Sequence, residues 1–118
     1  MTDSILFETG GHVARLTLNK PERHNALGAD ELTAIQAHLA AVEADPELRV
    51  LVVTGHGDKT FCAGAALNEL GAGKISGDFF QQTTDRLAAL RVPTICALNG
   101  NVFGGGVELA LSCDFRLG

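Results

Sequence analysis

The chain has 118 residues and a formal net charge of −5, from nine Lys and Arg against fourteen Asp and Glu. Its length suits a single domain, residues 1–118, and its 46% hydrophobic and 19% charged residues exclude an intrinsically disordered chain. Trp and Tyr are absent. The acidic balance and the lack of stacking aromatics argue against nucleic acid as a partner, because binding nucleic acid needs a basic face.

The N-terminus, MTDSILFETG, lacks a basic segment followed by a long apolar one, so we expect no signal peptide. The longest uncharged stretch, residues 92–107, is too short for a membrane span and is interrupted by Pro93, so no membrane partner is expected. Three cysteines leave one unpaired in any disulfide scheme, which favours free thiols in a cytoplasmic protein. The histidines lack the spacing of metal ligands, so no metal site is predicted.

The first half of the chain predicts a hairpin and a helix. Alternating apolar and polar residues on both sides of Gly10-Gly11 predict a β-hairpin of residues 5–8 and 13–18. A polar loop, residues 20–25, follows it. A helix is predicted from Gly28 or Asp30 to the stop at Asp45-Pro46, because apolar residues recur at helical spacing: Leu32, Ile35, Leu39 and Val42.

The second half alternates strands with helices. Residues 49–55 form an apolar run without alternation, which predicts a strand buried on both faces. Ser76 is a candidate cap for a helix over 77–91, and residues 94–98 read as a second buried strand. A short helix over 107–111 and a strand over 113–117 complete the chain. The order β-β-α-β-α-β-α-β predicts an α/β fold with parallel strands joined by helices.

Glycine makes up fourteen of the 118 residues and clusters in two turns that follow predicted strands, residues 60–67 and 98–108. Neither turn matches a dinucleotide or phosphate-loop pattern. In open α/β sheets ligands bind where strands end, and small residues let a ligand approach the backbone. Two N–H donors, one from each turn, would form an oxyanion hole for a carbonyl oxygen. The alternative is that the glycines only permit tight packing of strand against helix.

Two glutamates lie near these turns. Glu108 is in the first turn of a largely apolar helix. An apolar site raises the pKa of a carboxylate, which suits a general acid or base. The alternative is that Glu108 only stabilises the helix dipole. Glu69 follows the first turn and is interpreted as a solvated helix residue.

Six segments of the chain, taken in order, form a recognisable set: LNKPERHNAL (18–27), VVTG (52–55), FCAGA (61–65), PTICALNG (93–100), GGGVELAL (104–111) and CD (113–114). Together these segments resemble the N-terminal half of the enoyl-CoA hydratase/isomerase, or crotonase, superfamily. The resemblance implies a crotonase-like ββα spiral, truncated to its N-terminal half.

The resemblance implies that the chain binds acyl-CoA thioesters and stabilises an enolate, so that it hydrates 2-enoyl-CoA or isomerises it. The implied oxyanion-hole donors are the backbone amides of Ala65 and Gly105, and Glu108 matches one of the two catalytic glutamates. No cofactor is implied beyond the coenzyme A of the substrate, and the family implies a homo-oligomer built from trimers. The residues implied to meet the CoA nucleotide are Arg23, His24, Ala26, Ala63 and Gly64.

The chain departs from the family pattern at two points. Ala66 stands where the family usually has an Asp that caps the next short helix, and no Glu matches the second catalytic glutamate. Two alternatives to an enzyme therefore stay open: a non-catalytic acyl-CoA-binding or interaction module, and an inactive fragment. Half a spiral would also expose apolar faces and a strand edge near residues 113–117, so we expect the isolated chain to self-associate or to be poorly stable.

Overall fold

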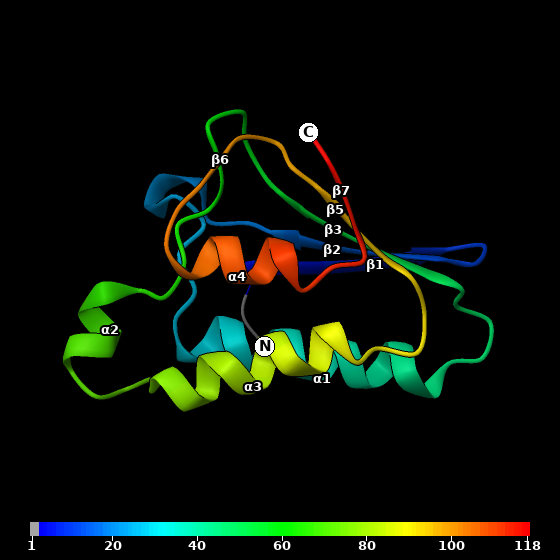
Figure 1. The fold of residues 1–118 in the computed structure, drawn as a ribbon, viewed down its shortest axis with the longest axis horizontal. Helices are drawn as coiled ribbons and strands as arrows, with labels where there is room; N and C mark the ends of the chain where they lie inside the picture. Colours follow the sequence, from blue (N-terminus) through cyan, green and yellow to red (C-terminus); the bar gives the residue numbers. More distant parts are fainter. Residues whose placement is uncertain (1–2) are drawn as a thin grey trace.

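The computed structural model describes residues 3–118, and within this range the strands form a five-stranded and a two-stranded sheet. The larger sheet has the order β1-β2-β3-β5-β7 (Figure 1). β1 runs antiparallel to β2, and every other neighbouring pair is parallel. The strands of this sheet are β1 (Ile5–Gly10), β2 (Val13–Leu18), β3 (Val50–Gly55), β5 (Thr94–Ala97) and β7 (Phe115–Leu117).

The predicted hairpin and the first predicted helix are confirmed. β1 and β2 are joined at Gly11, whose φ of +60° is a conformation that favours glycine. The helix is α1 (Ala29–Ala44), which packs against β1 and β2. Its buried face contains the apolar residues whose helical spacing predicted it: Leu32, Ile35, Leu39 and Val42.

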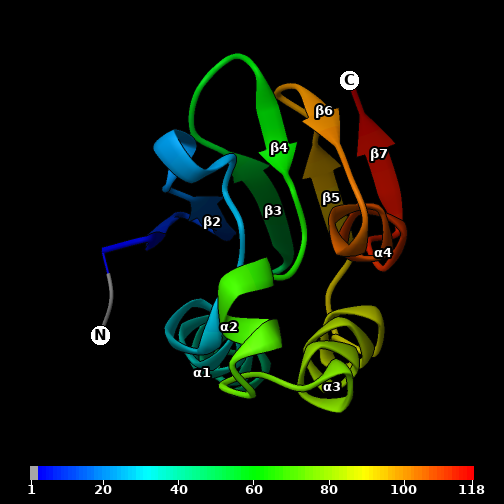
Figure 2. The ribbon, with the colours of Figure 1, turned by 90° about the vertical axis from the view of Figure 1, so that its left-hand side faces the viewer.

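The helix α3 (Gly77–Ala88) lies beside α1 on the same side of the sheet (Figure 2). Its cap is the predicted one, since the amide of Phe79 donates to Ser76 Oγ over 3.0 Å. The helix ends at Ala88, earlier than predicted. Between the two helices, Gln36 Nε2 donates to Thr83 Oγ1 over 2.9 Å. The two helices therefore form one layer under the sheet.

The prediction that the strand at residues 49–55 is buried on both faces is wrong. In β3, Leu51 and Val53 are buried, whereas Val52 and Thr54 are only half-buried. The strand at residues 94–98 shows the same alternation in β5. Within residues 3–118 the helices cover one face of the sheet, and apolar residues such as Val52 on the other face hid the alternation.

Several short elements were not predicted, because segments of two to five residues are too short for a periodic pattern. The helix α4 (Gly105–Leu111) begins two residues earlier than predicted, and β7 begins at Phe115 instead of residue 113. In the predicted polar loop a 3-10 turn forms at Pro21–Arg23. The unpredicted elements are the parallel pair β4 (Thr60–Cys62) and β6 (Asn101–Val102), and the helix α2 (Leu67–Gly71).

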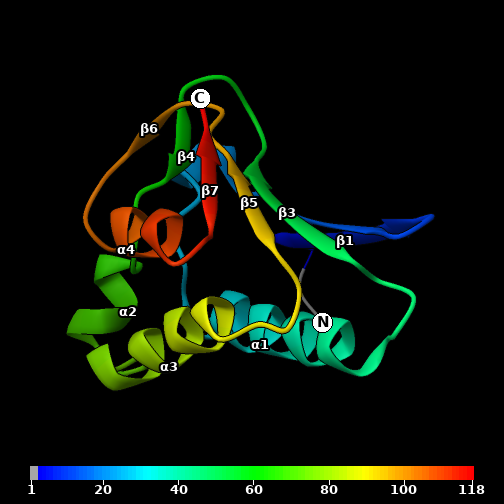
Figure 3. The ribbon, with the colours of Figure 1, turned by 45° about the vertical axis from the view of Figure 1, so that its right-hand side comes forward.

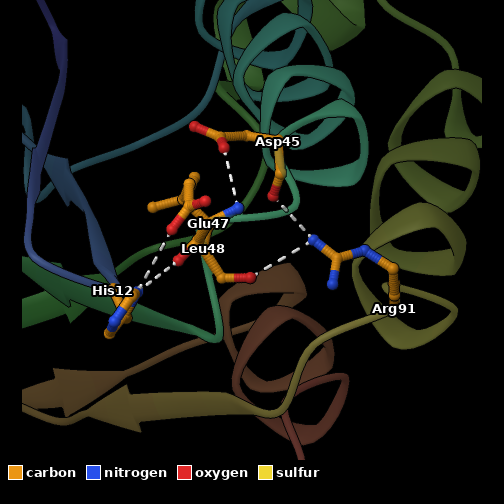
Figure 4. Close-up of polar contacts among 5 residues, drawn as sticks. All are labelled: His12, Asp45, Glu47, Leu48 and Arg91. Atoms are coloured by element: carbon orange, nitrogen blue, oxygen red, sulfur yellow. Dashed lines mark hydrogen bonds and ion pairs between the residues drawn. The ribbon is translucent and has the colours of Figure 1, made fainter.

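Arg91 binds the C-terminal end of α1. Its Nη2 donates to the carbonyl oxygens of Val42 (3.2 Å), Asp45 (2.9 Å) and Leu48 (3.2 Å), the last two drawn in Figure 4. The negative end of a helix dipole favours a cation at this position. On the other side of the same turn, His12 Nδ1 lies 2.7 Å from the carbonyl oxygen of Glu47 (Figure 4).

Replacing Arg91 with methionine is expected to lower the free energy of unfolding by about 1 kcal/mol, because three carbonyl groups lose a charged but exposed donor. Urea denaturation measures this change. Arg86→Met in α3 is the matched control, since within residues 3–118 Arg86 makes no side-chain hydrogen bond or ion pair. Equal losses in the two variants would contradict the role given to Arg91.

Candidate functional site

The two glycine-bearing turns meet through their backbones. β4 and β6 run side by side, and the amide of Phe103 donates to the carbonyl oxygen of Cys62 over 3.1 Å. Gly64 has φ +92°, and a Cβ built on it would lie 2.6 Å from the nitrogen of Gly105. A Cβ on Gly106 would overlap the Cys62 carbonyl. Glycine at 64 and 106 thus permits tight packing, and this packing brings the turn containing Ala65 against the start of α4.

The amides of Ala65 and Gly105 remain free to donate. Leu27 bridges to this turn, because its amide donates to Gly64 O (2.8 Å) and its carbonyl accepts from Ala66 N (2.9 Å). That pattern leaves the amide of Ala65 directed away from Leu27. Gly105 is the first residue of α4, where an amide has no partner within the helix. Within residues 3–118 neither amide donates a hydrogen bond to another residue.

Both of these residues line one cavity of about 350 Å³. Phe80 of α3 forms part of its wall and packs against Gly105, where an added Cβ would lie 2.6 Å from the ring. Glu108 lines the cavity from the first turn of α4 and, among residues 3–118, is its only acidic residue. Within residues 3–118 Glu108 is exposed, so the expected apolar surroundings of its carboxylate are not found. The remaining lining residues are Leu70, Ser76, Gly77 and Gln81.

A second cavity, of about 240 Å³, also borders Ala65. It is lined by three of the residues predicted to meet the CoA nucleotide, Arg23, Ala26 and Ala63. His24 is not among its lining residues. Instead, His24 lies 3.4 Å from Thr60 Oγ1 and lines a separate pocket of about 190 Å³ with His56 and Lys59. The structure therefore brings Arg23, Ala26 and Ala63 together. The carbonyl oxygen of His24 accepts from the amide of Ala63 over 3.0 Å, whereas its side chain lies at the other pocket.

A sequence model described as enoyl-CoA hydratase/isomerase matches residues 8–117. The chain belongs to the enoyl-CoA hydratase/isomerase family. It is 36% identical to a short-chain-enoyl-CoA hydratase of Clostridium acetobutylicum and 38% identical to a crotonyl-CoA hydratase of Syntrophomonas wolfei. Each match covers 98% of this chain and 46% of the relative, so the chain spans about half the length of the curated relatives it matches.

The fold of this family member is also found in solved structures. A crystal structure of an enoyl-CoA hydratase from Bacillus anthracis superposes with a TM-score of 0.88 at 33% identity, over 97% of this chain and 46% of that one. An enoyl-CoA hydratase/isomerase from Xanthobacter autotrophicus Py2 gives the same TM-score at 35% identity, over 98% and 46%. The predicted α/β crotonase-like fold is confirmed, with this chain corresponding to about half of it.

Asn25, which the sequence analysis did not single out, fastens the loop of this family member that contains Arg23 and Ala26. It is 1% exposed and has φ +55°. Its Oδ1 accepts from the amide of Lys20 over 2.8 Å. Its Nδ2 donates to three carbonyl oxygens, those of His56 (3.2 Å), Thr60 (3.0 Å) and Phe61 (3.1 Å). A lone Asn in a polar loop looks like an ordinary turn residue, so no signal in the sequence identified it.

The interpretation of Glu69 as a solvated residue is wrong. Its side chain lines the second cavity, and its Oε1 accepts from the amide of Ala29 at the start of α1 over 3.0 Å. Glu31 lies beside it, with Oε1 accepting from Gly28 N over 2.8 Å and Oε2 4.0 Å from Lys20 Nζ. Both carboxylates thus face the positive end of α1. Among residues 3–118, Arg23 has no ion-pair partner, so its charge remains available to a ligand.

Cys62 belongs to the first of the two turns, at the end of β4, and its side chain is buried. Burial raises the pKa of the Cys62 thiol to about 11, so it stays protonated near neutral pH. It accepts a hydrogen bond from the amide of Gly64 over 3.3 Å. All three cysteines are buried and free.

Among residues 3–118 there is no group of three or more His, Cys, Asp or Glu arranged to hold a metal ion. The same residues contain no helix that is long and apolar enough to cross a membrane.

A groove of about 450 Å³ lies away from the two turns, between α1 and α3. It contains none of the predicted site residues, and its surface is mostly apolar. Its lining residues are Leu39, Ala40, Glu43, Ala44, Arg86, Ala89 and Leu90. The groove therefore offers no donor pair comparable to Ala65 and Gly105.

Proposed function

We propose that this chain binds acyl-CoA thioesters and stabilises negative charge on the thioester oxygen through the amides of Ala65 and Gly105. The observation that carries the proposal is the position of Ala65, which borders both cavities. A thioester bound there would extend its CoA portion toward Arg23, Ala26 and Ala63 and its acyl portion toward Phe80. Membership of the family, and relatives that are named enoyl-CoA hydratases, support this substrate class.

The proposed reaction is the hydration of a 2-enoyl-CoA. Water adds to the carbon–carbon double bond, and electron density moves onto the thioester oxygen to form an enolate, which is then protonated at carbon 2. Losing one oxyanion donor typically costs about 2.7–4 kcal/mol of transition-state stabilisation. Of the residues that the structure describes, Glu108 is the only acidic one lining the cavity, and we assign it the role of holding water or moving a proton. No cofactor beyond the CoA of the substrate enters this scheme.

The single glutamate that the described residues place in this cavity favours a second candidate function, an acyl-CoA-binding module that binds its ligand without turnover. Hydratases of the family use two glutamates, and in the described part of the chain Glu108 is the one glutamate that lines this cavity. In that case the chain would bind the thioester but would lack the second glutamate that hydration needs. A trimer-based homo-oligomer, implied by the resemblance, and a cytoplasmic location, inferred from the three cysteines, remain predictions.

Titration calorimetry with crotonyl-CoA, alongside an assay for loss of the enoyl absorbance, tests both candidates. We expect wild-type chain to bind, and Arg23→Met to raise Kd roughly tenfold because a phosphate loses a charged donor. Arg15→Met, at an exposed position on β2, is the control and should leave Kd unchanged. The enzyme is supported if wild type hydrates crotonyl-CoA and Glu108→Gln still binds it but no longer hydrates it. Binding without any hydration supports the module, and absence of binding contradicts both.

A further inference from the structure

Glu69 connects two parts of the chain that are forty residues apart. It belongs to α2, and its carboxylate accepts a hydrogen bond from Ala29, the first residue of α1. α2 has only five residues, and its N-cap, Ala66, offers no side-chain hydrogen bond. A helix this short has little stability of its own. Its position therefore depends on contacts that it makes with the rest of the chain.

Gly28 makes room for this contact. Its φ of −95° and ψ of −170° are values that any residue adopts, so its backbone does not require glycine. A Cβ at this position, however, would overlap Oε2 of Glu69 and would lie 2.9 Å from Oε1 of Glu31. The absent side chain of Gly28 is thus the space that the Glu69 carboxylate occupies.

The same region fixes the backbone of Ala65. Leu27 precedes Gly28, and its two backbone hydrogen bonds, with Gly64 and Ala66, hold the residues on each side of Ala65. Residues 65–69 are consequently fastened at both ends to residues 27–29: by the backbone at Leu27 and by the Glu69 side chain at Ala29. Without the Glu69 side chain this segment would keep the backbone connection at Leu27 and lose the one at Ala29.

We propose that Glu69 is a positioning residue, which fastens α2 to the start of α1 and thereby holds the amide of Ala65 toward the cavity. The consequence for a bound thioester rests on the proposed function, whereas the effect on the Ala65 turn does not. In this chain, where Ala66 replaces the capping Asp usual in the family, Glu69 supplies a side-chain connection for α2.

Amide hydrogen exchange of the full chain, followed by NMR, tests the effect on the turn. Glu69→Ala should speed exchange of the Ala29 and Ala66 amides roughly tenfold, because a bond to a carboxylate is lost and α2 loosens. Glu69→Gln retains an oxygen acceptor and should exchange nearly as slowly as wild type. Gly28→Ala should behave like Glu69→Ala, since the added methyl group displaces the carboxylate.

Two controls separate this effect from general unfolding. The amides of β3 should exchange at wild-type rates in all variants, and Glu22→Ala, which removes an exposed carboxylate, should change nothing. Unchanged exchange at Ala66 in both Glu69→Ala and Gly28→Ala would overturn the proposal. So would faster exchange that spreads equally to β3, because it would make Glu69 a residue of general stability.

The infrared carbonyl band of a ¹³C-labelled crotonyl-CoA tests the consequence for the thioester. At saturation we expect wild type and Glu69→Gln to shift this band to lower frequency, and Glu69→Ala to shift it less. An equal shift in Glu69→Ala would overturn the role in positioning Ala65. If wild type causes no shift, the proposed oxyanion hole fails, while hydrogen exchange still decides whether Glu69 fastens the turn.

Discussion

Replacing Asn25 with alanine is expected to lower the free energy of unfolding by about 3 kcal/mol or more. The side chain is buried and makes four hydrogen bonds to backbone groups. Alanine would leave the amide of Lys20 and the carbonyl of Phe61 without these partners, and each buried unpaired group costs about 1–3 kcal/mol. The φ of +55° adds to the loss, because Asn tolerates this conformation better than Ala.

Urea denaturation of three variants tests this prediction. Asn68→Ala is the matched control, because Asn68 is exposed and its side chain makes no hydrogen bond within residues 3–118, so we expect a change within about 0.5 kcal/mol. Asn25→Asp should be at least as destabilising as Asn25→Ala, since it places a carboxylate oxygen against carbonyl oxygens. A loss in Asn25→Ala no larger than that in Asn68→Ala would show that the loop is held by other contacts.

The elements predicted correctly are those whose stability is visible locally. α1 has a long apolar stripe and a proline after it, and α3 has Ser76 at its start, so each carries its own signal in the sequence. β4, β6 and α2 carry none, because they exist only where distant segments pair or pack. β3 was misjudged for a related reason: apolar side chains on its less covered face look, in sequence, like residues buried by a second layer.

The site residues, too, were predicted where they carry a local signal in the sequence and missed where they do not. The two glycine turns were found because glycine is a local signal, and the structure places their backbones in contact. Asn25 and Glu69 were missed because their roles depend on partners 31 to 40 residues away. His24 was grouped with Arg23 because the two are adjacent in sequence. The backbone at His24, with φ +56°, instead places that side chain at a different pocket.

The isolated chain is expected to self-associate through β7 and α4. Within residues 3–118, β7 pairs with β5 on one side only, and Figure 3 shows it running beside β5 toward the C-terminus with α4 next to it. Phe115 and Leu117 of β7 are 59% and 62% exposed. An exposed apolar strand edge pairs readily with another chain. Val107 and Leu111 of α4 are exposed apolar residues too, as is Phe103 before it. We call these five exposed residues of β7, α4 and the segment before α4 the patch.

Sedimentation velocity over a range of concentrations measures this association. Wild type should sediment faster as its concentration rises, because association follows mass action. The double variant Phe115→Lys and Leu117→Lys should weaken association at least tenfold, since charges on an edge strand oppose pairing and each buried Phe or Leu contributes about 1.5–3 kcal/mol. Leu67→Lys is the control: Leu67 is 81% exposed on α2, outside the patch, and its replacement should leave association unchanged.

Two results would contradict this prediction in different ways. A wild-type chain that stays monomeric and unfolds cooperatively at every concentration would show that the patch is compatible with an independent fold. Association that survives the double lysine variant would exclude the β7 edge as the contact. The uncovered face of the sheet, where Leu6 and Val13 are 42% and 40% exposed, would then be the next surface to alter. Because β7 offers unpaired backbone groups as well as apolar side chains, we expect it, and not that face, to dominate.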